Sequence, residues 1–504
     1  MRCMLSAREA ATGLRTTHTL LATLAFAVGL GPRGVVGQAV HESSVPSRTP
    51  AAGAVARAPE GLDALIRDVM TRGGVPGLAV AVLRNGAVAW VGAYGVADAD
   101  SSRPVTVETV FDAASLGKPV FAYAVLRLAE RGEFDLDRPL PEYLPSGELK
   151  GNPRAKMITG RRVLSHTSGL PNWRGGGPLT IEFDPGDRFS YSGEGYLYLQ
   201  QVIETVTSLN ADALVRREVF APLGMAASSY AWRDSYDSTA AVGHDYLQRP
   251  VRKDAHAKAN VAATLYTTVG DYAHFVAETA RPTLVKDTTE VEMLKAQVEV
   301  QKDVAWGLGW GLERSAEGRL FWHWGDNETF QSFAIGCRAT GDALVLLTNG
   351  ENGLSIAEPI VDAVLPGPHA VFGWLDYDRF DSPARTIRER VVRAGGANGE
   401  RGVVRTLSEL ERTYPRAAFT EKLLNRIGYE LLGKKRVDAA AAVFERNVKL
   451  YPASWNVYDS LAEAYAAGGD TQLAIQYYTK SLKLNPDNAN AKAALRQLRD
   501  AKTR

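Results

Sequence analysis

The chain has 504 residues, more than one ordinary domain needs, so two or three domains are expected. Hydrophobic residues make up 45% and charged residues 23%, which is typical of a globular protein that buries a sizeable core. A formal net charge of +1 gives no reason to expect nucleic acid or a membrane surface as a partner.

The N-terminal stretch has the pattern of a secretory signal peptide. Three arginines precede an apolar run over residues 20–30, and small residues follow it up to Ala39. The run is too short to span a bilayer comfortably, and a buried N-terminal helix is the alternative interpretation. We therefore expect residues 1–39 to be removed on export, leaving a secreted or periplasmic protein. Residues 40–58, rich in Ser, Pro and Ala, are expected to form a linker.

Cysteine and histidine usage predicts neither a disulfide framework nor a metal site. Cys3 lies in the predicted signal peptide, and Cys337 is expected to be a buried small apolar residue. His166 and His323 have no second ligand at the spacing that metal sites use. We accordingly expect no metal and no cofactor.

A helix and a β-hairpin are predicted first along the chain. Apolar residues over 62–69 follow a helical pattern that ends at Gly73. An apolar strand over 77–83 comes next, and Asn85-Gly86 accepts the positive φ angles of a tight turn. A partner strand over 88–96 completes an antiparallel hairpin.

The stretch that follows the hairpin places a nucleophile beside a base. Residues 111–118 read Phe-Asp-Ala-Ala-Ser-Leu-Gly-Lys, and a helical pattern then runs to Gly132. Because Pro119 is compatible only with the first turn of a helix, the helix should start near Ser115. Lys118 would then lie about one turn away on the same face. The alternative is a serine N-cap and a solvated lysine.

Two further loop patterns precede a second helix. Residues 164–171 read Leu-Ser-His-Thr-Ser-Gly-Leu-Pro, and residues 185–196 read Pro-Gly-Asp-Arg-Phe-Ser-Tyr-Ser-Gly-Glu-Gly-Tyr. A helix is predicted over 197–206, and residues 211–280 are expected to be mostly helical with loops. We interpret His166 as a structural residue that holds its loop.

Beyond Trp306 the pattern changes to strands. They are expected over residues 307–312, 320–324, 333–336 and 343–347, followed by a helix over 356–364. Strands at both ends of residues 59–372 thus flank a long helical middle. This predicts an α+β domain, in which helices and an all-helical subdomain surround one antiparallel sheet built from distant parts of the chain.

The C-terminal third carries the period of tetratricopeptide repeats (TPRs), since Pro452 and Pro486 stand 34 residues apart. Two successive repeats carry the same four marks, which are a small residue, a second small residue, an aromatic residue and a proline. In the first repeat these are Gly428, Ala440, Phe444 and Pro452, and in the second they are Ala462, Ala474, Tyr478 and Pro486. Residues 409–415 are typical of the end of a degenerate earlier repeat. We expect a linker over 373–384 and α-helical TPRs over 385–504, which could bind a protein partner. A plain helical tail is the alternative.

Three short patterns stand in order: Ser115-x-x-Lys118, Tyr191-Ser192-Gly193 and His323-Trp324-Gly325. Together with the loop around His166 they resemble the serine β-lactamase and penicillin-binding-protein superfamily. The resemblance covers roughly residues 60–370. It is strongest to the class C branch, which also holds family VIII esterases and D-stereospecific amino- and carboxypeptidases. It implies a β-lactamase/transpeptidase-like fold and a serine hydrolase that forms an acyl-enzyme.

The resemblance also implies roles for individual residues. Serine, lysine and tyrosine form the catalytic set of the superfamily, which assigns these roles to Ser115, Lys118 and Tyr191. Either Lys118 or Tyr191 could then be the base that activates the serine. For Tyr191 the alternative is an ordinary buried core tyrosine.

The third pattern would line the site from an edge strand. There His323 would orient the substrate and Gly325 would let the substrate approach the strand. The backbone N–H of Asp326, with that of Ser115, would form the oxyanion hole. The alternative for His323 is a surface histidine on an edge strand.

Two departures from β-lactamases limit the expected substrates. Gly193 stands where β-lactamases carry an asparagine, and His323 stands where they carry a lysine. Both weaken the case for β-lactam hydrolysis and favour an ester, amide or D-peptide substrate. The main hypothesis is therefore an exported serine hydrolase with a TPR module. The alternative is a penicillin-binding-like recognition protein without turnover, whose repeats recruit a partner.

Overall fold

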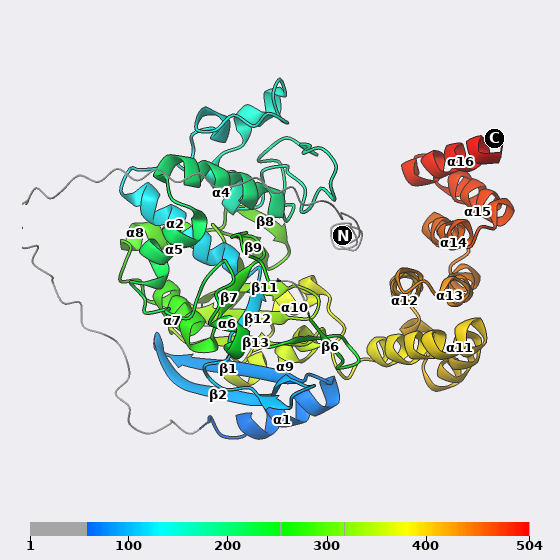
Figure 1. The fold of residues 1–504 in the computed structure, drawn as a ribbon, viewed down its shortest axis with the longest axis horizontal. Coiled ribbons are helices and arrows are strands. Elements are labelled where there is room, and N and C mark those ends of the chain that lie inside the picture. Colours follow the sequence, from blue (N-terminus) through cyan, green and yellow to red (C-terminus); the bar gives the residue numbers. More distant parts are fainter. Residues whose placement is uncertain (1–57, 253–254, 317, 503–504) are drawn as a thin grey trace, which may run out of the picture. The chain divides into compact units, whose positions relative to one another are not determined.

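The computed structural model describes residues 58–252, 255–316 and 318–502, so the predicted signal peptide and nearly all of the first linker lie outside it (Figure 1). The chain forms two compact units. The first unit holds the described residues up to Asp63 together with Pro76–Glu351 and Val361–Ala370. The second holds Ala64–Val75, Asn352–Ile360 and the chain from Val371 onward.

A nine-stranded antiparallel sheet lies at the centre of the first unit, in the order β3-β2-β1-β13-β12-β11-β10-β9-β8. Its strands are β1 (Gly77–Arg84), β2 (Ala87–Asp98), β3 (Arg103–Pro104), β8 (Val298–Gln301), β9 (Val304–Trp306), β10 (Gly311–Ser315), β11 (Gly318–Asp326), β12 (Gln331–Cys337) and β13 (Ala343–Thr348). Because β1 pairs with β13, the two ends of the unit meet in the middle of the sheet. This confirms the predicted α+β class.

The predicted hairpin is present as β1 and β2. Its turn is built by Asn85, with φ of 50°, and Gly86, with φ of 77°, as a tight hairpin turn requires. The predicted burial of Cys337 is also confirmed, since its side chain is only 1% exposed.

The strand predicted over 307–312 is wrong in position. β9 ends at Trp306 and β10 begins at Gly311, and the residues between them form a turn in which Gly309 has φ of 93°. A Cβ atom at Gly309 would lie 2.6 Å from the Ala122 side chain. Gly309 therefore allows a tight turn that packs against the helix carrying Ala122. The apolar pattern of this stretch does not reveal such a turn.

Helices surround this sheet. The longer ones are α2 (Gly117–Glu130), α4 (Gly193–Thr207) and α7 (Val269–Ala280), and the shorter ones are α3 (Gly160–Leu164), α5 (Ala211–Val215), α6 (Tyr236–Thr239) and α8 (Asp287–Met293). α7 packs on β1, β2, β12 and β13, so it covers one face of the sheet. α4 contacts α3 and α5, and α5 in turn contacts α2, as expected of a helical subdomain.

Two small antiparallel sheets were not predicted. One pairs β4 (Phe111–Ala114) with β7 (Leu265–Thr267), and the other pairs β5 (Gly243–His244) with β6 (Pro250–Val251). Three of these strands fall in the region expected to be mostly helical. They are too short to show a period, and only pairing with distant residues defines them.

The second unit is helical. Its main helices are α11 (Pro383–Thr413), α12 (Glu421–Gly433), α13 (Val437–Leu450), α14 (Trp455–Ala467), α15 (Thr471–Leu484) and α16 (Ala489–Lys502). α11 breaks at Gly399 into two helices. These two helices form the helix pair that a degenerate first repeat should contain. A Cβ atom at Gly428 would lie 2.3 Å from the Phe444 ring, so the small residue lets paired helices approach. These features confirm the predicted repeats.

The second unit also includes most of α1 (Leu62–Gly73), so the compact units differ from the predicted domain boundaries. Arg385 Nη2 donates to the Gly73 carbonyl at 2.7 Å, which caps the last turn of α1. The linker predicted over 373–384 is partly wrong, because α10 (Ala370–Leu375) occupies its start and α11 begins within it.

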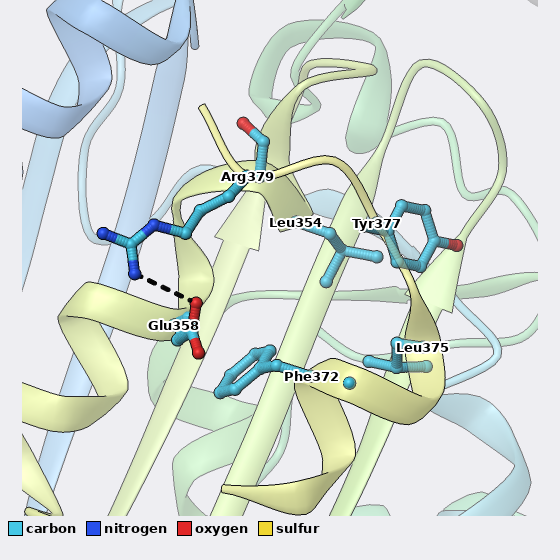
Figure 2. A pocket seen from close by; sticks show the side chains of 8 residues that line it. Leu354, Glu358, Phe372, Leu375, Tyr377 and Arg379 are labelled. Carbon is cyan, nitrogen blue, oxygen red and sulfur yellow. Dashed lines mark hydrogen bonds and ion pairs between the residues drawn. The ribbon is translucent and has the colours of Figure 1, made fainter. Parts of the chain in front are cut away.

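A hollow of about 210 Å³ beside α10 lies within the second unit (Figure 2). Arg379 and Glu358 line it and form an ion pair at 3.2 Å, and Arg379 also pairs with Asp381 at 2.8 Å. The charge of Arg379 is therefore compensated within the unit. In the described ranges no helix is long and apolar enough to cross a membrane.

Candidate active site

Ser115 lies at the junction between β4 and α2, in the first unit. The preceding residue, Ala114, has φ of 50°, in the left-handed region that non-glycine residues rarely adopt. Backbone strain of this kind collects at functional sites. The first helical residue is Gly117 and its N-cap is Leu116, which makes no side-chain cap. The N-cap alternative for Ser115 is therefore wrong.

Lys118 lies within hydrogen-bond distance of Ser115. Its Nζ donates to Ser115 Oγ at 2.9 Å and to the Ala262 carbonyl at 2.6 Å. Lys118 is fully buried, which contradicts the solvated-lysine alternative, and no carboxylate of the described residues pairs with it. Burial lowers the pKa of Lys118 well below its usual value. An uncharged amine beside a hydroxyl can accept the proton of that hydroxyl.

Tyr191 lies against Lys118, whose Nζ is 4.7 Å from the centre of the phenol ring. The Tyr191 hydroxyl is buried and forms no hydrogen bond with the residues that the structure describes. Burial raises the pKa of Tyr191, and the nearby Ser115 side chain offsets only part of this. Tyr191 is therefore a protonated phenol at neutral pH, with a hydroxyl free to donate.

His166 positions the Tyr191 loop, in agreement with its structural interpretation. Its ring stacks on Tyr191, with ring centres 4.3 Å apart, and its Nδ1 accepts from the Ser192 N–H at 3.0 Å. Burial, with smaller effects of Lys118 and His323, lowers the pKa of His166 well below its usual value. The ring is therefore neutral, with Nδ1 unprotonated.

β11 is not an edge strand, so that prediction is wrong. It lies between β10 and β12, because β8, β9 and β10 add to the sheet outside it. β10 reaches only to Trp322, however, and residues 323–326 extend beyond it. On one side these residues pair with β12, and on the other they have no strand partner among the described strands.

His323 is fully buried, which contradicts the surface-histidine alternative. Its Nδ1 donates to the Trp324 carbonyl at 2.7 Å, so Nε2 carries a lone pair. That Nε2 atom is buried and has no hydrogen-bond partner in the described part of the chain. Burial lowers the pKa of His323 to about 3, and Lys118, when protonated, adds to this effect. This position therefore carries no positive charge.

Gly325 lies in close contact with the segment that carries Ser115. A Cβ atom there would lie 2.2 Å from the Ala113 carbonyl oxygen, so the glycine lets β11 pack on β4, and the approach of substrate to this strand stays a prediction. Asn327 fastens the same junction, because its Nδ2 donates to the Asp112 carboxylate and to the Ala263 carbonyl, each at 2.9 Å. The strand end that carries Asp326 is thereby fixed to the Ser115 segment.

Gly325→Ala is expected to destabilise the protein by about 1–3 kcal/mol, because backbone atoms rather than a flexible side chain oppose the new methyl group. Gly270→Ala, in the first turn of α7, is the matched control. A Cβ atom there meets nothing within 4 Å, so this change should stabilise by up to about 1 kcal/mol. Urea unfolding measures the free energy of unfolding of each variant. Equal stabilities of the two variants would contradict the close packing of β11 on β4.

Some parts of the site left no recognisable pattern in the sequence. Ala262 contributes only its carbonyl oxygen, which accepts from both Lys118 and Ser115. Its loop is shaped by Asn260, whose Oδ1 accepts from the Ala262 N–H at 2.9 Å. Gln200 of α4 accepts from the N–H of Val261 at 3.1 Å. Within the described residues no cluster of His, Cys, Asp and Glu could hold a metal ion.

Close packing explains the glycine of the tyrosine pattern. A Cβ atom at Gly193 would lie 2.6 Å from the Trp173 ring and 2.8 Å from the Asn172 carbonyl oxygen. The Gly193 N–H donates to Asn172 Oδ1 at 3.1 Å. An asparagine at Gly193 would therefore not fit without moving this loop.

The Ser115, Lys118 and Tyr191 constellation lies inside a region that matches a known family. The Beta-lactamase family profile covers residues 62–367, and a tetratricopeptide repeat profile covers residues 455–488. The chain belongs to the Beta-lactamase family. The TPR match makes protein interaction the expected use of the second unit.

Two curated proteins show how far the Beta-lactamase relationship extends in sequence. Esterase EstB of Burkholderia gladioli is 30% identical over 221 residues, which covers 38% of this chain and 56% of that protein. Protein flp of Staphylococcus aureus (strain MRSA252) is 22% identical over 320 residues, which covers 57% of this chain and 62% of that protein. The chain therefore spans less than two thirds of either relative.

Solved structures share the fold of the Beta-lactamase region. The penicillin-binding protein homologue from Pyrococcus abyssi has a TM-score of 0.53 at 21% identity, covering 66% of this chain and 81% of that one. A class C beta-lactamase has a TM-score of 0.53 at 20% identity, and the match covers 61% of this chain and 96% of that one. These likenesses support the β-lactamase/transpeptidase-like architecture.

Proposed function

We propose that this Beta-lactamase family protein is a serine hydrolase that forms an acyl-enzyme on Ser115. The observation that carries the proposal is the 2.9 Å contact between Ser115 Oγ and the buried, unpaired Nζ of Lys118. Ser115 Oγ attacks the carbonyl carbon of the substrate while Lys118 Nζ takes the hydroxyl proton. We favour Lys118 over Tyr191 as the base for acylation, because burial keeps the Tyr191 phenol protonated.

Tyr191 is proposed to deliver a proton to the leaving group. As the bond between the carbonyl carbon and the leaving group breaks, the phenol donates its proton and recovers one from protonated Lys118. Water then attacks the acyl carbon and gives a proton to uncharged Lys118. The bond between the acyl carbon and Ser115 Oγ breaks, Lys118 returns the proton to Oγ, and the acid leaves. The Ser115 N–H, which donates to no described residue, and the Asp326 N–H are the proposed oxyanion donors.

An uncharged ester is the favoured substrate class. Neutral His323 offers no cation to a substrate carboxylate, unlike the lysine that β-lactamases carry in this pattern. Gly193 supplies no side-chain amide for a substrate amide group. The 30% identity to Esterase EstB points in the same direction. Amide and D-peptide substrates are the second choice within the same mechanism.

A fluorophosphonate probe and a substrate panel test this proposal. Wild type should react with the probe and hydrolyse short-chain p-nitrophenyl esters faster than D-amino-acid amides or nitrocefin. Failure to react with the probe, together with no burst on any of these compounds, would instead favour the recognition protein without turnover.

Tyr191→Phe should lower turnover by about 10²–10⁴-fold without loss of stability. The buried hydroxyl has no hydrogen bond to lose, so its removal leaves no partner unsatisfied. Steady-state ester hydrolysis and thermal unfolding, measured on the same preparations, check the two parts. Full activity in this variant would exclude Tyr191 from the catalytic set.

Export is a separate proposal, supported by the arginines and the apolar run of residues 1–39. N-terminal sequencing of the protein recovered from a bacterial periplasm or medium would test it. A mature chain that begins near residue 40 is expected, and full-length protein confined to the cytoplasm would contradict it.

A further inference from the structure

Helices α14 and α15 of the TPR unit line an open surface hollow of about 430 Å³ (Figure 1 shows the two helices). Its lining residues are Tyr458, Gln476, Tyr477, Thr479, Lys480 and Lys483. They include two lysines and no acidic side chain. The hollow lies far along the chain from Ser115, and its interpretation does not depend on the proposed function.

Tyrosine rings form one wall of this hollow. The Tyr477 ring is nearly parallel to that of Tyr465, with centres 5.6 Å apart and an interplanar angle of 9°. It is also nearly parallel to the Tyr458 ring, with centres 6.4 Å apart and an angle of 18°. Stacked rings of this kind hold each other in place and offer a rigid apolar surface at low entropic cost.

The cations beside these rings have no anionic partner. Lys480 Nζ lies 5.6 Å from the centre of the Tyr458 ring, and both Lys480 and Lys483 are exposed. Neither lysine forms an ion pair with any residue that the structure describes. Of the acidic residues near the tyrosine wall, Glu445 accepts from the Tyr465 hydroxyl at 2.7 Å, and neither Glu445 nor Asp470 forms an ion pair with these lysines among the described residues. The positive charges of Lys480 and Lys483 are therefore available to a partner.

The preceding repeat shows that repeat packing does not require this arrangement. Thirty-four residues before the three tyrosines stand Leu424, Leu431 and Val443, all fully buried. The residue equivalent to Lys480 is Arg446, which pairs with Glu411 at 2.5 Å. The residue equivalent to Lys483 is Lys449, which is exposed as well, so the two repeats differ at the three aromatic positions and at Lys480. A binding role explains this difference better than a structural one.

We propose that this hollow binds an extended acidic peptide segment of a partner protein, with two carboxylates separated by one residue. Lys480 and Lys483 are three residues apart on one helix, so their Cβ atoms lie about 5–6 Å apart. Alternate residues of an extended chain are about 6.6 Å apart and point the same way. Two such carboxylates reach both lysines, and an apolar side chain two positions further along contacts the tyrosine wall.

Fluorescence anisotropy with the full-length protein tests this proposal. The probe is a fluorescein-labelled peptide with the core Leu-Ala-Glu-Ala-Glu, and the control peptide has the core Leu-Ala-Gln-Ala-Gln. At about 50 mM salt, where exposed ion pairs are least screened, wild type should bind the acidic peptide saturably. Lys480→Gln combined with Lys483→Gln should weaken this binding about tenfold, and the glutamine peptide should bind wild type equally weakly.

The matched control combines Lys435→Gln with Lys492→Gln, which removes two exposed charges of the same unit outside the hollow. It should bind the acidic peptide like wild type. Equal weakening by both double variants, equal binding of both peptides, or no binding to wild type would overturn the proposal. Tighter binding of a single-stranded oligonucleotide than of the acidic peptide would also overturn it. Thermal unfolding of each variant confirms that the fold is retained.

Discussion

Ser115→Ala is expected to lower kcat/KM for an activated ester by at least about 10⁴-fold. The loss follows because Ser115 Oγ is the only described hydroxyl to which Lys118 Nζ donates, so no neighbouring group replaces the nucleophile. The variant should remain folded, since Ser115 is only partly buried and its removal leaves Lys118 bound to the Ala262 carbonyl. Stopped-flow hydrolysis of p-nitrophenyl acetate measures the effect.

Ser408→Ala provides a control that removes the same side chain elsewhere. Ser408 is exposed on α11 and its hydroxyl donates only to the Val404 carbonyl of its own helix. Its replacement should change neither ester hydrolysis nor probe labelling. A Ser115→Ala variant that retains more than about one hundredth of wild-type activity would contradict a serine nucleophile at this position.

Lys118→Met is expected to lower acylation by about 10³-fold, the typical contribution of a positioned base. Methionine fills a similar volume and removes the one group that accepts the serine proton. The Ala262 carbonyl loses a donor, which costs about 1–3 kcal/mol, but the cost of burying an amine disappears as well. We therefore expect a folded variant with intact substrate binding. Single-turnover kinetics should show a slowed burst, and an unchanged burst would exclude Lys118 as the base.

The pH dependence of wild type adds a second readout for Lys118. Because burial lowers its pKa, hydrolysis of an uncharged ester should rise with pH through that lowered pKa and become level above it. A lysine with the usual pKa of about 10.4 would instead give a rate that still rises at pH 9. Lys118→Met should remove this acid limb.

Folding stability should respond to Lys118 with a definite sign. The folded state disfavours the charged amine, so the unfolded state binds more protons between the lowered pKa and about 10.4. The contribution of Lys118 to the free energy of unfolding therefore becomes less favourable as pH falls through this range. The difference in stability between wild type and Lys118→Met, measured by urea unfolding at several pH values, should shift accordingly.

Local patterns predicted much of the fold and the Ser115–Lys118 pair. Their three-residue spacing and Pro119 depend only on helix geometry, and the observed helix begins two residues beyond Ser115. The β1–β2 turn follows from Asn85-Gly86, and the TPR helices follow from a period that recurs within the chain. In each case the deciding residues are close in sequence.

Features that depend on distant residues could not be predicted in this way. The Ala262 carbonyl reaches Lys118 across 144 residues and has no side-chain signature. β11 lies inside the sheet because β8 to β10 pair beyond it, and these strands are short. The burial of His323, which keeps it uncharged, follows from the rings of Tyr191, Trp306 and Trp324 packed around it. The close contact of Gly325 with the backbone of Ala113 likewise joins residues far apart in the sequence.

Mass spectrometry of the trapped acyl-enzyme tests the mechanism most directly. The protein is mixed with an activated ester, quenched in acid within the burst phase and digested, and the adduct is located on the resulting peptides. We predict one acyl group per chain, on Ser115, and none in the Ser115→Ala variant. An adduct on another residue, or an undiminished adduct in Ser115→Ala, would contradict acyl transfer through Ser115.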